Sequence, residues 1–178
     1  RNIYPGVFRK SFGFEKWKDF DSNLFDAIYN DDSAEREFAH RILGYDLNMH
    51  AVEAARNNVK SAGVADIVSI KQRDIRKFVK PENPAIIITN PPYGERLTPP
   101  DILNIYYTLG ERLKHEFQGG EAWVISYKQE CFDEIGLKPS IKIPLYNGSL
   151  DCELRKYQLF SGKLDDFRAS GGEVKTDE

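Results

Sequence analysis

The sequence has few of the residues that carry redox, disulfide or metal chemistry. Its 178 residues include 2 cysteines, 3 histidines and 1 methionine. So few cysteines do not make the disulfide scaffold of a small secreted protein, and they fit a reducing compartment such as the cytoplasm. No Cys/His spacing matches a metal site, so we expect no metal cofactor.

The sequence also lacks a long apolar run and an excess of charge of one sign. No apolar segment approaches the ~18 residues of a membrane span, and we expect no membrane partner. The 25 Lys and Arg residues nearly balance the 28 Asp and Glu residues, for a net charge of -3. Such a balance gives no overall attraction to nucleic acid or to anionic membranes. The length suits one domain of roughly 100–200 residues.

Several common motifs are absent as well. There is no Walker-type phosphate loop, no glycine-rich dinucleotide-binding fingerprint and no G-x-S-x-G nucleophile elbow. The chain starts at Arg1 without the basic and apolar regions of a signal peptide, and its only methionine is Met49. We therefore expect a processed protein or a piece of a longer one.

What is present is an alternation of apolar and amphipathic segments. The patterns predict helices over 14–30, 49–61, 102–117 and 129–135 and strands over 41–46, 67–70, 85–89, 122–127, 141–146 and 150–160. This order predicts an α/β domain with a mostly parallel sheet, and the turn at Asn147-Gly148 predicts a closing antiparallel hairpin. Asn48 and Asp101 are expected helix N-caps, and Gly63 a helix-ending glycine.

Two further expectations concern burial and the end of the chain. The segment 85–89 is apolar throughout, which is typical of a parallel strand covered on both faces. From Ser161 onward the sequence is polar, so we expect a folded part over 1–160 and a mobile tail over 161–178.

The strongest candidate site is the turn after the apolar strand 85–89, Asn90-Pro91-Pro92-Tyr93. The prolines cannot donate to a sheet ladder and therefore end the strand. The Asn90 side-chain oxygen and the Pro91 carbonyl could both accept from a planar exocyclic NH₂, while the Tyr93 ring stacks on the base that carries it. The alternative is a strand-terminating turn without chemistry, but the position directly after a buried strand favours the functional interpretation.

Acidic residues end the two preceding strands. Asp46 could accept hydrogen bonds from both hydroxyls of a ribose, or it could form only an Asx turn that leads into the Asn48 cap. Asp74 could accept from an adenine amino group, or it could pair with its basic neighbours in the run 71–80. That run is the only basic cluster, and a solvated face is its simpler explanation. Arg96, just past the turn, is a better candidate for a phosphate contact.

These motifs together resemble a known family. The run Asn90-Pro91-Pro92-Tyr93-Gly94-Glu95-Arg96-Leu97 is similar to the amino-group methyltransferase motif, in the form found in THUMP-domain 23S rRNA guanine-N2 methyltransferases. That family was formerly named N6-adenine-specific DNA methylases. Three more segments resemble it: Phe12-Gly13-Phe14-Glu15-Lys16-Trp17, Gly44-Tyr45-Asp46-Leu47-Asn48, and the closing hairpin Tyr146 to Leu154.

The resemblance implies a Rossmann-like fold and S-adenosylmethionine as cofactor. In that family pattern Asp46, within the ribose motif that includes Leu47, holds the ribose, and Asp74 with the Ile75 backbone contacts the adenine. Asn90, Pro91 and Pro92 form the catalytic turn that orients the target amine, Tyr93 stacks on a flipped base, and Arg96 contacts the substrate. The sulfonium of the cofactor is a strong electrophile, so the reaction needs no metal.

The chain departs from the family at its start. The first strand, the glycine-rich cofactor loop and the upstream RNA-binding THUMP domain are missing, and the missing strand is central, between the Asp46 and Asn90 strands. We expect the 178 residues alone to bind the cofactor poorly and to be inactive. The leading hypothesis is the catalytic segment of a cytoplasmic rRNA guanine-N2 methyltransferase that contacts rRNA mainly through the upstream domain. The alternatives are an N6-adenine methyltransferase on DNA or RNA, and a non-catalytic fragment.

Overall fold

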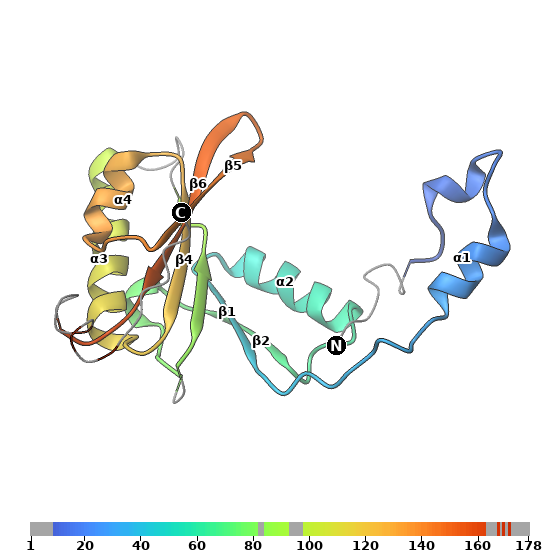
Figure 1. The fold of residues 1–178 in the computed structure, drawn as a ribbon, viewed down its shortest axis with the longest axis horizontal. Coiled ribbons are helices and arrows are strands. Elements are labelled where there is room, and N and C mark those ends of the chain that lie inside the picture. The colour runs from blue at the N-terminus through green and yellow to red at the C-terminus, as the bar shows by residue number, and fades with distance from the viewer. Residues whose placement is uncertain are drawn as a thin grey trace. The chain divides into compact units, whose positions relative to one another are not determined.

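A computed structural model describes residues 9–81, 84–92, 98–162, 167, 169 and 171. The chain divides into two compact units, Arg1–Asp74 and Ile75–Glu178, each of which has its own sheet (Figure 1). The mixture of helices with parallel and antiparallel strands is the predicted α/β architecture.

The first unit begins with an aromatic segment in place of the long helix predicted over 14–30. A short 3-10 helix, η1, covers Gly13–Lys16, and α1 covers only Ser22–Tyr29. The prediction was wrong because Asp21 caps α1: its side chain accepts from the Leu24 backbone N–H at 3.0 Å, and a new helix starts there. The aromatic rings of this segment contact one another, among them Phe12, Phe14, Phe20, Phe25 and Tyr29.

The rest of the first unit is a strand–helix–strand arrangement. β1 (Ile42–Asp46) and β2 (Val68–Gln72) are parallel, and α2 (Met49–Ser61) connects them. The Asn48 side chain accepts from the backbone N–H groups of His50 and Ala51, which confirms the predicted cap. Gly63 follows the last turn with a φ of 64°, the left-handed conformation expected of a helix-ending glycine.

The second unit contains a four-stranded sheet in the order β3-β4-β6-β5. After the short η2 (Ile75–Lys77), its elements are β3 (Ile86–Thr89), α3 (Pro99–Glu116), β4 (Glu121–Ser126), α4 (Gln129–Ile135), β5 (Ile141–Asn147) and β6 (Leu150–Gln158). β3 and β4 are parallel, whereas β6 is antiparallel to both of its neighbours, which confirms the closing hairpin. β5 therefore points in the same direction as β3 and β4.

The start of α3 and the position of the hairpin turn differ from the prediction. α3 starts at Pro99, with Thr98 as its N-cap, because proline is well tolerated in the first turn of a helix; Asp101 accepts from the Thr98 hydroxyl instead of capping the helix. The hairpin turn is Gly148-Ser149 rather than Asn147-Gly148, with a φ of 63° at Gly148.

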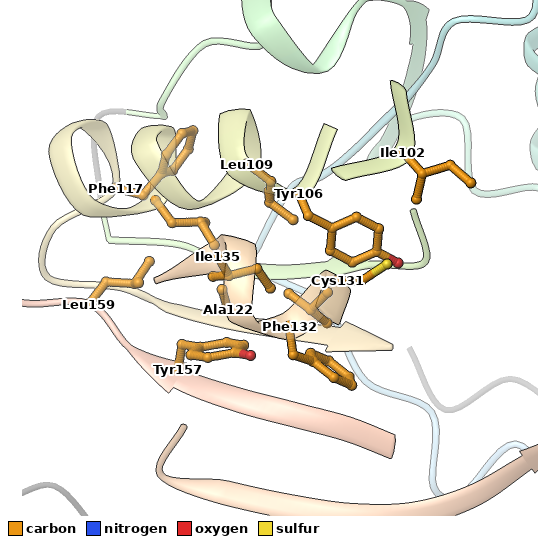
Figure 2. Close-up of a cluster of buried hydrophobic side chains, with 12 residues drawn as sticks. Ile102, Tyr106, Leu109, Phe117, Ala122, Cys131, Phe132, Ile135, Tyr157 and Leu159 are labelled. Atoms are coloured by element: carbon orange, nitrogen blue, oxygen red, sulfur yellow. The ribbon is translucent and has the colours of Figure 1, made fainter. Parts of the chain in front are cut away.

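The core of the second unit lies between one face of its sheet and the helices α3 and α4 (Figure 2). The buried side chains come from both helices and from β4 and β6, and they are Ile102, Tyr106, Leu109, Leu113, Phe117, Ala122, Val124, Cys131, Phe132, Ile135, Tyr157 and Leu159. The two helices approach closely at Gly110. A Cβ at this position would lie 2.1 Å from the Ile135 carbonyl oxygen, so only glycine fits.

The opposite face of this sheet is open along β3. Ile86 and Ile88 are 67% and 77% exposed, so the expectation that this strand is covered on both faces was wrong. The crossovers β3-α3-β4 and β4-α4-β5 advance in the same direction along the sheet, and right-handed crossovers therefore put both helices on one face.

The two strands expected to flank a missing central strand are both edge strands. Among the described residues, β1 pairs only with β2, and β3 pairs with β4 and no other strand.

Candidate active site

The turn after β3 combines a rigid backbone with an exposed amide. β3 ends at Thr89, Asn90 is exposed, Pro91 is buried and Pro92 is exposed. The buried Pro91 ring has a fixed φ and anchors the chain directly after Asn90. The Asn90 amide therefore stands on a fixed platform at the carboxyl edge of the sheet, where α/β folds bind ligands.

A buried polar group supports this edge from β4. The Ser126 hydroxyl, fully buried, accepts from the Tyr106 hydroxyl at 3.2 Å and from the Lys128 backbone N–H at 3.4 Å. Cys131 lies in the same core, and burial raises the pKa of its thiol. A thiol held protonated is a poor nucleophile, in agreement with the sequence interpretation of Cys131 as a core residue.

A buried arginine fixes the start of α4 at the same edge. The Arg155 guanidinium lies 3.7 Å from the centre of the Phe132 ring and donates to Gln129 Oε1 at 2.7 Å. It also donates to Glu153 Oε2 at 2.7 Å, so that this buried charge is paired. These contacts join α4 to β6, and Tyr127 and Lys128 are the two residues between β4 and α4. The Lys128 Nζ lies 5.4 Å from the centre of the exposed Tyr127 ring.

In the first unit, Asp46 and Leu47 end β1 at the carboxyl edge of the two-stranded sheet. Asp46 is exposed, and its Oδ1 accepts from the Asn48 backbone N–H at 2.7 Å, which is the Asx turn considered from sequence. A carboxylate has two oxygens, each of which can accept more than one hydrogen bond, so this turn leaves Asp46 capacity for a ligand. The Leu47 carbonyl accepts from the Gln72 side chain at 2.9 Å, and its side chain is exposed.

Asp74 lies two residues beyond the end of β2 and is half-buried. The ends of β1 and β2 are tied together, because the Arg73 backbone N–H donates to the Asp46 carbonyl at 2.9 Å. Asp46, Leu47 and Asp74 are therefore at one edge of one sheet. Ile75, half-buried, is the first residue of the second unit, which also contains Asn90 to Pro92.

Two predicted site residues, Tyr93 and Arg96, lie outside the described residues. Tyr127 and Lys128, at the end of β4, also lie at the carboxyl edge of the second sheet, and the sequence patterns did not single them out. The basic run of 71–80 includes structural contacts: Arg73 lies 5.6 Å from the centre of the Tyr45 ring, and Lys80 donates to the Gln118 carbonyl.

The described residues contain no group of three or more His, Cys, Asp and Glu side chains placed to hold a metal ion. In the same part of the chain, no helix combines the length and apolar character needed to cross a membrane. Within the first unit, the oxygen-rich ends of β1 and β2 fit an organic ligand with hydroxyl and amino groups.

The chain is similar to known proteins in sequence and in fold. The family model of UPF0020, described as an RMKL-like methyltransferase domain, matches residues 1–156. The ribosomal RNA large subunit methyltransferase K/L of Photobacterium profundum is 34% identical over 171 residues, which are 92% of this chain and 24% of that protein. The chain thus spans about a quarter of the length of the curated relatives it matches.

Two solved structures are similar over 91% of this chain and 43% of their own. One is a candidate methyltransferase complexed with SAH, with 31% identity and a TM-score of 0.79. The other is a possible methylase from Clostridium difficile 630, with 29% identity and a TM-score of 0.77. The fold of this chain is therefore that of a Rossmann-like methyltransferase.

Proposed function

The chain belongs to the UPF0020, RMKL-like methyltransferase family, and we propose that it is the catalytic segment of an enzyme that methylates the N2 amino group of a guanine in large-subunit rRNA. The observation that carries the proposal is the exposed Asn90 amide on the fixed Pro91–Pro92 turn at the carboxyl end of β3. The names of the relatives, ribosomal RNA large subunit methyltransferases, support rRNA as the substrate.

The cofactor of this reaction is S-adenosylmethionine, which supplies a methyl group on a positively charged sulfur. The residues at the edge of the first sheet fit it: the Asp46 carboxylate would accept from the ribose hydroxyls, and Asp74 from the adenine amino group. The backbone of Leu47 and Ile75 would line the same ligand. The presence of SAH in the similar solved structure supports S-adenosylmethionine as the cofactor.

The catalytic turn acts by positioning. The Asn90 side-chain oxygen and the Pro91 carbonyl would accept the two N–H groups of the target amine, which directs the nitrogen lone pair toward the methyl group. Pro92 stiffens the turn, because its own φ is fixed and it restricts the conformation of Pro91 before it. Fixing two reactants in line can supply several kcal/mol of the barrier reduction, roughly 7–11 in favourable cases.

The substrate roles of Tyr93 and Arg96 complete the proposal. Tyr93 would stack on the flipped base, and Arg96 would contact the RNA backbone. Most of the grip on rRNA would come from an upstream domain, since the net charge of this chain is -3. An enzyme with this substrate would act in the cytoplasm.

A pair of variants in the full-length protein tests the site. Asn90→Ala should lower kcat by about 10²-fold or more while the affinity for S-adenosylmethionine stays within about twofold, because the amine loses its acceptor. Asp46→Ala should instead weaken cofactor binding by about 10- to 100-fold, because hydrogen bonds to a charged group are lost. Asn57→Ala, an exposed asparagine on α2, is the matched control.

The product identifies the substrate. Unmethylated rRNA is treated with the enzyme, digested to nucleosides and analysed by mass spectrometry. N2-methylguanosine is the expected product, whereas N6-methyladenosine would support the alternative target. Full activity of Asn90→Ala would refute the catalytic assignment.

A further inference from the structure

The β5–β6 hairpin extends past the carboxyl end of β4 (Figure 1). Asn90 lies at the same end of the sheet, directly after β3. The last pair between β4 and β6 is Ser126 with Glu153. Beyond it, β5 and β6 continue for three more pairs, the last of which is Asn147 with Leu150. At about 3.4 Å per residue, the hairpin rises roughly 10 Å above the end of β4.

This overhang is on the same side as the catalytic turn. β3, β4 and β5 run in one direction, so their carboxyl ends share an edge, and the overhang is the continuation of β5 at that edge. Strands lie about 4.8 Å apart, which puts β5, the third strand from β3, roughly 14 Å from the Asn90 strand. The overhang is therefore a wall beside the place where the target base would enter.

The exposed side chains of this wall are unusual. Tyr146 is 78% exposed although it is a large aromatic residue within a strand. Strand alternation puts Lys142 and Pro144 on the same face of β5 as Tyr146; both are exposed and lie just below the overhang, where β6 still pairs with β4. An aromatic ring in line with a cation is the combination with which proteins hold single-stranded nucleic acid, by stacking on a base and neutralising a phosphate.

We propose that the β5–β6 hairpin contacts RNA: the Tyr146 ring in the overhang stacks on a nucleotide next to the flipped target, and Lys142, four residues earlier on the same face of β5, contacts a phosphate of the same RNA strand. The inference rests on the proposed function, because it takes the same edge of the sheet as the entry of the base. Enzymes that flip a base select its sequence context through the flanking nucleotides. Tyr146 is thus a substrate-positioning residue that does not touch the reacting atoms.

A protein partner that adds a strand to β5 is less suited to this surface than RNA. Pro144 has no backbone N–H and Lys142 carries a charge, two features by which edge strands avoid pairing with another strand. They leave the aromatic ring accessible and the backbone unsuited to strand addition.

The test compares Tyr146→Ala, Tyr146→Phe and wild type in the full-length protein, with steady-state methylation of an rRNA fragment. Loss of the ring should raise the KM for RNA about 5- to 100-fold, while kcat at saturating RNA and the KM for S-adenosylmethionine stay within about twofold. Tyr146→Phe keeps the stacking surface and should behave like wild type. Tyr107→Ala is the control, since Tyr107 is 52% exposed on α3, about 12 Å along the helix from its start.

Lys142→Ala adds a second readout, because loss of one phosphate contact should lower the salt dependence of RNA binding by about one unit of slope. An unchanged KM for RNA in Tyr146→Ala, with an active wild type, would overturn the inference and leave the proposed function intact. A changed oligomeric state with unchanged RNA kinetics would indicate a protein contact and would overturn it too. If the wild-type enzyme does not methylate rRNA, both the proposed function and this inference are refuted.

Discussion

Gly110 on α3 allows a sharp test of how the second unit is packed. Replacing it with alanine adds one methyl group, and the added Cβ would lie 2.1 Å from the Ile135 carbonyl oxygen and 2.7 Å from the carbonyl carbon. In an exposed helix the same change would stabilise the protein by about 1 kcal/mol. Here the methyl group meets backbone, which cannot rotate away, so α4 must shift.

Overpacking of this kind costs about 1–3 kcal/mol, and backbone displacement puts Gly110→Ala at the upper end. We expect a net loss of about 2 kcal/mol once the gain of about 1 kcal/mol in helix propensity is subtracted. At 1.4 kcal/mol per tenfold change, amide hydrogen exchange in α3 and α4 should become about 30-fold faster.

Hydrogen exchange measured by mass spectrometry on the full-length variant checks this value, with peptides from α2 as an internal reference. Gly13→Ala is the matched control, because a Cβ at Gly13 meets no atom within 4 Å. If exchange in α4 slows or stays unchanged in Gly110→Ala, the close contact between α3 and α4 does not exist as described.

Two more predictions concern pH and the cofactor. Burial raises the pKa of Tyr157 to about 12. An unfolded tyrosine ionises near pH 10, so the unfolded chain loses this proton first, and stability should fall by ~2–3 kcal/mol between about pH 10 and about pH 12. In urea unfolding, the free energy of unfolding of Tyr157→Phe should lack this part of the pH dependence. The substitution itself should cost little stability, because the Tyr157 hydroxyl has no hydrogen-bond partner among the described residues. Equal pH dependence in both proteins would contradict the burial of this ring. Separately, calorimetry should detect little or no binding of S-adenosylmethionine to the 178-residue chain alone, which does not contain the glycine-rich loop that the family resemblance implies; low-micromolar affinity would disprove this.

The fold could be predicted where the signals were local. α2 matches its predicted range because the Asn48 cap and Gly63 both act within a few residues of the helix ends. The helix predicted over 14–30 failed although Asp21 gave a local signal, because the apolar stripe continued across it. The exposure of Ile86 and Ile88 could not be predicted, since burial of a strand depends on what packs on the sheet and not on the strand itself.

Some residues of the candidate site could likewise be identified from local sequence signals, and others could not. Asp46, Asp74 and Asn90 were identified because acidic residues and prolines mark the ends of strands, and the structure puts each of them at such an end. No sequence signal distinguished Tyr146 from an ordinary tyrosine in a β-hairpin. Its position became visible only from the strand register, which shows how far β5 and β6 continue beyond β4.

The two edges of the four-stranded sheet differ in a way that matters for handling the protein. β5 is blunted by Lys142 and Pro144, whereas β3 is a short run of isoleucines with an open edge among the described residues. Uncharged, β-branched edges without proline are templates for intermolecular sheet growth. We therefore expect aggregation of the isolated chain to begin at β3, and a charged substitution at Ile86 or Ile88 to improve its solubility.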